Sequence, residues 1–340
     1  VENKQVNQVS EFPRSLSSTG IFESVGGLVP AQGVYPYEIV QNLFEPNTQV
    51  DRVVALPGLK KISKFRQNML TKGLIRGEWQ FPTNTVFART VSLILGVDES
   101  SPVRRMETQV LHYDGKQFQP YNYIWNDAQT DAFLSDGNES VTRLEKGGGL
   151  AAENVTWPHS SRSDCLTCHL IRTGGVQGFV DWQLDHEVSI EGRRENQLNW
   201  FESSGFFDEP VLVRSSGSPE DLVGESSLDL HARRYLHTNC AHCHRPQGGG
   251  GAQIDLRYDT SLDRMGLVGE RPLLGDFSLT EPALVVPGSP SQSVLFYRMA
   301  KLGAGHMPRL GSSEIDYSGL QQIGDWIVGM NGQTDALGEF

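Results

Sequence analysis

The sequence predicts an α+β multidomain protein, with an antiparallel β-sandwich-like domain in the N-terminal half and a mainly α-helical part after it. Two patterns support this prediction. Several short segments between residues 30 and 155 alternate apolar and polar residues, as half-buried strands do. After residue 226, apolar residues recur at helical spacing instead, with Gly- and Pro-rich stretches between the segments.

Six strands are expected in the β-rich domain, which spans residues 30–155. They cover residues 52–56, 78–81, 85–95, 104–113, 117–125 and 140–144. An Asp-Gly pair at 114–115 is typical of a tight turn between two of these strands. A short capped helix is expected at 127–134, whereas the polar, Ser-rich residues 1–29 are expected to be an irregular lead-in.

The rest of the chain is expected to form two further parts. Residues 156–225 contain much loop, a helix at 179–187 and a linker rich in Ser, Gly and Pro. Residues 226–340 are expected to form a compact helical domain. Its helices are expected at 228–238, 292–302 and 317–330, because each of these segments has apolar residues along one face.

The composition is that of a globular protein, with 38% hydrophobic and 21% charged residues. The sequence contains no run of apolar residues long enough for a transmembrane segment, and residues 1–5 do not resemble a signal peptide. The formal net charge of −12 argues against nucleic acid or an anionic membrane as a partner. It is compatible with docking onto a basic patch of a partner protein.

All four cysteines lie in two C-x-x-C-H motifs. The first motif consists of Cys165, Cys168 and His169, and the second of Cys240, Cys243 and His244. Cysteines three residues apart lie about one helical turn from each other, so each can form a thioether with one vinyl group of the same porphyrin. The following His can then bind the iron as its proximal ligand. The motifs therefore predict two covalently attached haem c groups.

Zinc sites, redox-active dithiols and structural disulfides are the other interpretations of these motifs. Zinc sites of this type usually have about 15–20 residues between the pairs, but Cys165 and Cys240 are 75 residues apart. A thioredoxin-like dithiol needs a βαβ context that neither motif has, and disulfides do not require a His after both pairs. Because haem c is attached outside the bacterial cytoplasm, haem attachment predicts a periplasmic or exported, surface-held protein after removal of a signal peptide.

The segment 226–330 resembles class I cytochrome c domains. It has a helix that leads into C-x-x-C-H, a Met-Pro loop and a closing helix with an aromatic residue. The resemblance implies that the second cysteine pair attaches a haem, that His244 is its proximal ligand and that Met307 is its distal ligand. His306, next to Met307, is the nearest competitor. A thioether ligand favours ferrous iron and raises the reduction potential.

The sixth iron ligand of the first haem is less defined, because no Met-Pro loop lies between the two motifs. The Met and His residues between 100 and 240, outside the motifs, are Met106, His112, His159, His186, His231 and His237. His186 lies on an expected helix, 17 residues after His169, and can fold back. Met106 and His112 lie on expected strands and could reach across. His159 is expected on the proximal side, and an open sixth position is a further alternative.

The whole chain also resembles a family of exported bacterial dihaem proteins with a β-rich N-terminal half. The matching stretches are residues 105–111, 123–133, 161–169 and 239–246. This resemblance implies two haems but assigns no reaction. The favoured function is electron transfer to or from a redox partner, and the alternative is a peroxidase- or oxidase-type haem enzyme with an open first haem fed by the second. A third hypothesis is carbohydrate or protein binding by aromatic residues of the β domain: Trp79, Tyr121, Tyr123 and Trp125.

Overall fold

The chain divides into two compact units in the computed structural model. The described residues are 2–8, 11–64, 79–96, 101–135, 140–146, 153–169, 175–211, 227–310 and 314–330. The first unit contains residues 1–40 and 47–215, and the second contains 41–46 and 216–340. The expected lead-in and the segment with the first motif therefore belong to the same unit as the strands.

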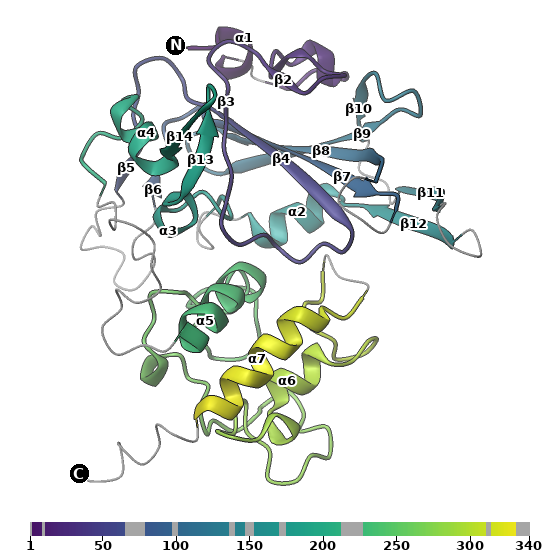
Figure 1. Ribbon diagram of the computed structural model, residues 1–340, viewed down its shortest axis with the longest axis vertical. Coiled ribbons are helices and arrows are strands. Elements are labelled where there is room, and N and C mark those ends of the chain that lie inside the picture. The colour runs from purple at the N-terminus through teal and green to yellow at the C-terminus, as the bar shows by residue number, and fades with distance from the viewer. Residues whose placement is uncertain are drawn as a thin grey trace. The chain divides into compact units, whose positions relative to one another are not determined.

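A six-stranded antiparallel sheet forms the centre of the first unit (Figure 1). The strand order is β10 (Ala132–Leu134), β9 (Phe118–Trp125), β8 (Val103–Tyr113), β7 (Val86–Ile94), β4 (Thr48–Ala55) and β3 (Tyr35–Pro36). The prediction of an α+β protein with an antiparallel sheet in its N-terminal half is confirmed.

The remaining strands of the described ranges form two-stranded sheets. The pairs are β1 (Phe22–Ser24) with β2 (Val29–Pro30), β5 (Ser63–Lys64) with β6 (Trp79–Gln80), β11 (Ser140–Lys146) with β12 (Glu153–His159), and β13 (Glu187–Ile190) with β14 (Arg193–Asn196). The faces of the large sheet are therefore covered by these small pairs, by short helices and by loops. The helices are α1 (Lys4–Asn7), η1 (Leu16–Ser18), α2 (Arg162–Cys168), α3 (Asp181–Leu184) and α4 (Gln197–Ser203).

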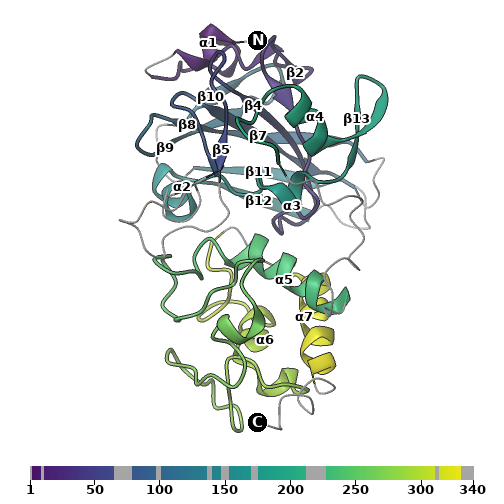
Figure 2. The same ribbon diagram turned by 90° about the vertical axis from the view of Figure 1, so that its left-hand side faces the viewer.

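Successive residues of β8 face opposite sides of the sheet, and each side has its own core. Val110 packs with side chains of the N-terminal segment, whereas Leu111 packs against the core that contains Phe179. Figures 1 and 2 show α1 and β2 on one side of the sheet and α2 and α3 on the other. The N-terminal segment is not a mere lead-in, since its own side chains of Leu16 and Ile21 are almost completely buried.

The expected helix at 127–134 is wrong. This segment turns the chain from β9 into β10: Asn126 N–H donates to Asp131 O at 3.0 Å, and Gln129 adopts a left-handed φ of 58°. The sheet pairing buries Ala132 completely, opposite Trp125, which outweighs the local preference for a capped helix.

The aromatic residues that a carbohydrate platform would need belong largely to the core. Tyr123 is completely buried, and Trp79 and Trp125 are less than a tenth exposed. Tyr121 packs, partly buried, on the same core as Tyr123, and the Tyr123 hydroxyl donates to Pro13 O at 2.8 Å. The described positions of these rings do not support a role in carbohydrate binding.

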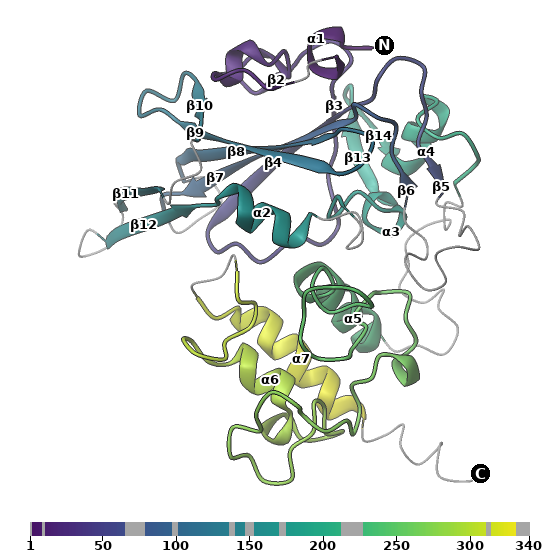
Figure 3. The same ribbon diagram turned by 180° about the vertical axis from the view of Figure 1, so that it is seen from behind.

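The described part of the second unit contains three helices and two short 3₁₀ turns (Figure 3). They are α5 (Ser227–Cys240), η4 (Leu262–Arg264), η5 (Pro290–Gln292), α6 (Val294–Met299) and α7 (Tyr317–Gly329). Each expected helix of this part is present, although α6 is shorter than 292–302. Within the described ranges of both units, no helix has the length and apolar character needed to cross a membrane.

Helices α5 and α7 pack through a glycine and an aromatic ring. A Cβ atom placed on Gly319 would lie only 2.2 Å from the ring of Tyr235, so the two helices approach as closely as glycine allows. Farther along the contact, Trp326 Nε1 donates to Asp229 Oδ1 at 2.9 Å, and Asp229 is 3.4 Å from Arg233. This packing fixes the helix that ends at the second motif.

Candidate functional site

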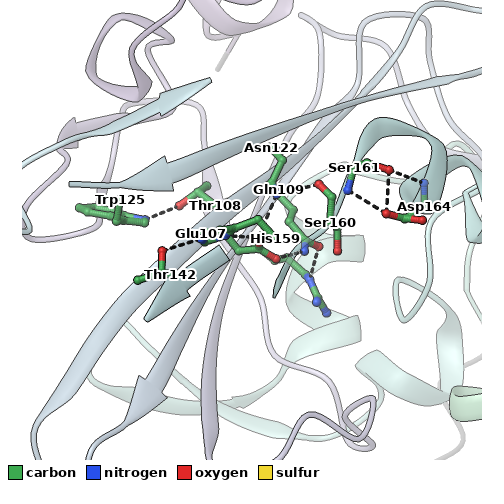
Figure 4. Close-up of polar contacts among 11 residues, drawn as sticks. Glu107, Thr108, Gln109, Asn122, Trp125, Thr142, His159, Ser160, Ser161 and Asp164 are labelled. Carbon is green, nitrogen blue, oxygen red and sulfur yellow. Dashed lines mark hydrogen bonds and ion pairs between the residues drawn. The ribbon is translucent and has the colours of Figure 1, made fainter. Parts of the chain in front are cut away.

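The first motif begins on α2, whose start is fixed by a capping box (Figure 4). The Ser161 hydroxyl accepts from Asp164 N–H at 3.2 Å, and the Asp164 carboxylate accepts from Ser161 N–H at 3.0 Å. The helix then places Cys165 and Cys168 one turn apart. Neither cysteine forms a disulfide, and both residues are partly exposed, as attachment of a porphyrin requires.

His169 follows α2, and a hydrogen bond orients its ring. Nδ1 lies 2.7 Å from Gly175 O, so Nδ1 carries the proton and Nε2 carries the lone pair. Metal-binding histidines usually donate their other ring N–H to a carbonyl or carboxylate in this way. Gly175 has a φ of 67°, and a Cβ atom there would lie 2.2 Å from the Phe118 ring, so the carbonyl that orients His169 depends on glycine.

His112 does not lie near the first motif. It belongs to the same face of β8 as Val110, which is the face covered by the N-terminal segment, whereas α2 lies on the opposite side. The His112 ring is 5.6 Å from that of Phe12, and its Nε2 is 3.1 Å from Asn84 Oδ1. The structure therefore contradicts the expectation that His112 reaches across to the first haem. Met106 is buried on the same strand, where the pairing register of β8 with β7 shifts, and no described contact joins it to the first motif.

His186 is the remaining candidate for the sixth position of the first haem. It lies just after α3, on the same side of the sheet as α2, and burial lowers its pKa. Its Nδ1 is buried and has no hydrogen-bond partner among the described residues. His159 is different, because both of its ring nitrogens lie within 3.0 Å of protein oxygens.

The second motif begins at the last residue of α5. Cys240 ends the helix, and its carbonyl accepts from Cys243 N–H at 3.1 Å and from His244 N–H at 2.9 Å. The chain thus turns tightly and keeps both cysteines and the histidine together. His244 Nδ1 is buried, and the described structure gives it no hydrogen-bond partner.

A cavity in the second unit contains the expected distal ligand. It has room for about one water molecule and is lined by Phe44, Tyr235, Met299, His306, Met307, Pro308, Glu314 and Asp316. Tyr235 belongs to α5, so the Met307 thioether shares a cavity with the helix that carries the second motif. Met299 is a second thioether in this cavity, and sequence reasoning placed it only in the core.

Arg298 anchors the loop that carries Met307. Its guanidinium donates to Gly305 O at 3.1 Å and to Leu274 O at 2.7 Å, and its own carbonyl accepts from Met307 N–H at 3.1 Å. The positive charge of Arg298 also contributes to the lowered pKa of His244, for which burial is the largest cause. Nothing in the sequence singled out this arginine, because its partners are backbone carbonyls in separate loops.

The thiols are unlike those of redox-active dithiols. Burial raises the pKa of Cys165 to about 11 and that of Cys240 to about 12, whereas reactive dithiols have lowered pKa values. Over the described ranges, no group of three or more His, Cys, Asp or Glu side chains is arranged to hold a metal ion without a porphyrin.

Acid is expected to destabilise the second unit through His237. Its Nδ1 accepts from Tyr258 N–H at 3.0 Å, and burial, followed by repulsion from Arg245 and Arg257, lowers its pKa from 6.5 to about 3. His237 takes up a proton near pH 6.5 in the unfolded chain but only near pH 3 in the folded unit. The contribution of neutral His237 to stability is therefore complete above pH 6.5. As the pH falls from 6.5 to 4, about 3 kcal/mol of the free energy of unfolding is lost, and the loss approaches about 5 kcal/mol below pH 3.

Urea unfolding at pH 7 and pH 4 measures this effect. His237→Gln keeps an acceptor for Tyr258 N–H but does not titrate, so its stability should change less between the two pH values. An equal loss of stability in both proteins would contradict the assignment to His237.

The donor atoms at both motifs fit a c-type haem: two thiols outside any disulfide, three residues apart, and an imidazole directly after them. The buried, unpartnered nitrogen of His244 strengthens this fit at the second motif. The pocket around Met307 is far smaller than the roughly 300 Å³ at which ligand pockets usually begin, so the fit rests on the donors rather than on volume. Comparison of the chain with protein-family models, with curated proteins and with solved structures gives no match.

Proposed function

We propose that this protein is a dihaem c-type cytochrome that transfers electrons to or from a redox partner in the periplasm or at the cell surface. Its two haems are attached through Cys165 and Cys168, and through Cys240 and Cys243. Each haem supplies an iron that gains and loses one electron. The protein residues bind the haems, provide the axial ligands and set the charge around them.

The proximal ligands in this proposal are His169 and His244. His169 uses Nε2, because its Nδ1 proton is held by Gly175 O. Met307 is the distal ligand of the second haem, and His186 is the candidate for the first. His306 remains the competitor of Met307, since both of its ring nitrogens are buried and lack a hydrogen-bond partner in the described part of the chain.

The observation that carries the proposal is the shared cavity of Met307 and α5. A thioether beside the motif-bearing helix closes the sixth position of the iron, which is typical of an electron carrier rather than an enzyme. The glycine–aromatic contact of α5 with α7 supports the same assignment, because it holds the helix before the motif against a closing helix.

The acidic charge of the chain suits a redox partner with a basic docking patch. A net charge of −12 attracts such a partner at long range and favours fast, reversible encounter. The alternative function, a peroxidase- or oxidase-type enzyme with an open first haem, depends on His186 not being a ligand. No contact among the described residues favours that alternative.

The proposal predicts the number of covalent haems in cysteine variants. The protein expressed with the haem-attachment machinery should carry two haems, the Cys165→Ser/Cys168→Ser and Cys240→Ser/Cys243→Ser variants one each, and the quadruple variant none. Intact mass and the pyridine haemochrome spectrum measure this count. His242→Gln is the matched control, because this residue lies inside the second motif but is neither an attachment site nor a ligand.

The same samples test the competing interpretations. Zinc bound in proportion to intact cysteine pairs, or a protein that carries no covalent haem with all four cysteines present, would overturn the proposed function. Loss of haem from the His242→Gln variant would show that the count depends on folding rather than on attachment.

A further inference from the structure

A short segment from the first half of the sequence belongs to the second unit. Residues 41–46 lie between β3 and β4, two strands of the large sheet, yet they pack as part of the second unit. The residues on either side of the segment are held in the first unit: Val40 N–H donates to Gln183 O at 3.1 Å, and Asn47 O accepts from Ile94 N–H at 2.7 Å. The resemblance to a class I cytochrome c domain begins far later in the sequence, so this segment needs a separate explanation.

One hydrogen bond joins the segment to the residue before the second motif. Asn239, on α5, is 1% exposed, and its Oδ1 accepts from Phe44 N–H at 2.8 Å. Its Nδ2 donates to Tyr235 O at 3.1 Å, one turn earlier on the same helix. A buried amide needs partners at both ends, and Asn239 has one on its own helix and one at Phe44. The neighbour of Cys240 therefore holds the backbone of the segment at Phe44.

The side chain of Phe44 lines the cavity that contains Met307. Tyr235, another aromatic residue of this lining, has a hydroxyl that is hydrogen-bonded to Asp316, whereas Phe44 has no polar atom. The cavity has room for about one water molecule. Because Phe44 is partly exposed, truncation of its side chain would open this cavity toward solvent.

This position matters because a thioether is a soft ligand that ferric iron binds less strongly than a nitrogen ligand. A small ligand such as imidazole can replace it: the bond between iron and the Met307 sulfur breaks, and a bond between iron and the imidazole nitrogen forms. The iron stays ferric, and no electron or proton is transferred. The incoming ligand needs space beside Met307, and the ring of Phe44 occupies part of that space.

We propose that Phe44 determines the ligand specificity of the second haem site, an inference that rests on the proposed haem attachment and on Met307 as the distal ligand. The ring of Phe44 excludes small ligands and so keeps the sixth position of the iron for Met307. Asn239 acts as a positioning residue, because it holds the backbone of Phe44 at the cavity. Phe44 and Asn239 are 195 positions apart, so the site takes residues from both halves of the chain.

Imidazole binding to the ferric protein tests this proposal. The full-length Cys165→Ser/Cys168→Ser variant is the parent, because it carries only the second haem and its visible spectrum reports on that haem alone. Phe44→Ala should raise the binding constant for imidazole by roughly tenfold, because the ligand no longer has to displace a packed ring, which costs more than the 1.4 kcal/mol that a factor of ten represents. Leu43→Ala is the matched control: it truncates an apolar neighbour outside the cavity lining and should bind imidazole like the parent.

A double-mutant cycle tests the positioning role of Asn239. Asn239→Ala alone should raise the binding constant, because Phe44 N–H loses its acceptor. In a protein that already carries Phe44→Ala, the same change should have little further effect, because no ring remains to be positioned. A residue with a merely structural role would change imidazole binding by the same factor in both backgrounds, and that result would overturn the positioning role.

The possible outcomes separate this proposal from the proposed function. Equal imidazole binding by the parent, Phe44→Ala and Leu43→Ala overturns the inference, while a covalent haem in all three proteins leaves the proposed function standing. A parent without covalent haem overturns the proposed function as well, and the haemochrome spectrum shows this before any imidazole is added.

Two further measurements cover the case in which Phe44→Ala does not fold. Phe44→Leu keeps an apolar side chain but loses the flat ring, so its binding constant should exceed that of the parent by a smaller factor than in Phe44→Ala, and a constant equal to the parent's overturns the inference. In the wild type, hydrogen exchange of Phe44 N–H should be slower than in an unfolded peptide, because its acceptor is buried. Exchange at the peptide rate would show that Asn239 does not hold Phe44 and would overturn the inference.

Discussion

Replacement of Met307 with Leu is expected to lower the reduction potential of the second haem by on the order of 0.1–0.2 V, within the range of about 0.8 V over which axial ligands set haem potentials. Leu keeps the volume of the side chain but has no sulfur to bind iron, so ferrous iron loses its thioether ligand. The reduced variant should also bind CO at one haem, because the sixth position of that iron is open. Potentiometry and optical spectra with CO measure both effects.

Met299 provides a matched control, because its thioether lines the same cavity and is 7% exposed. Met299→Leu makes the same chemical change eight residues before the proposed ligand and should leave the potential within a few tens of millivolts of the wild type. If Met299→Leu lowers the potential and Met307→Leu does not, Met299 is the ligand. If neither variant changes the potential, His306 becomes the candidate.

The sequence alone predicts local structure that depends on a few consecutive residues. Both C-x-x-C-H motifs, the helix before the second motif and the hairpin pairing of β8 with β9 depend on local spacing, and the structure has each of these elements where it was expected. The cap of α2 is similarly local, since Ser161 and Asp164 are three residues apart.

The sequence does not show which side chains of a strand lie near the first motif, because this depends on the face of the sheet that each one occupies. Met106 and His112 are candidates because they lie in the right region, but the register of β8 turns His112 away from α2. Glu107 lies on the opposite face of the strand from His112 and contacts His159, which lies 52 positions later on β12. No local pattern pairs these two residues, because their contact exists only once β8, β9 and β12 are assembled.

The N-terminal segment shows the same limit for burial. Polar, Ser-rich residues with scattered apolar ones gave no periodic signal, yet Val6, Phe12 and Leu16 contribute to a core of the first unit. Each of them packs in one core with strand residues of the sheet, such as Val86 and Val110. Whether these side chains are buried depends on the shape of the sheet, and the sequence of the N-terminal segment carries no information about that shape.

Gly319→Ala is expected to destabilise the second unit by roughly 2 kcal/mol. The new methyl group would lie 2.2 Å from the Tyr235 ring, which is rigid and buried, so α5 and α7 must move apart at a cost of about 3 kcal/mol. The higher helix propensity of Ala returns about 1 kcal/mol of that cost. Urea unfolding of the dihaem protein, followed by far-ultraviolet circular dichroism, measures the difference.

Gly329→Ala, on the same helix, is the matched control. A Cβ atom at Gly329 would meet Leu228 at 3.5 Å, an ordinary contact, so this variant should be as stable as the wild type or slightly more stable. Tyr235→Leu in the Gly319→Ala background should restore part of the lost stability, because the shorter side chain makes room for the methyl group. Equal stability of the two glycine variants would contradict the close packing of α5 against α7, and with it the support that this contact gives to the second haem site.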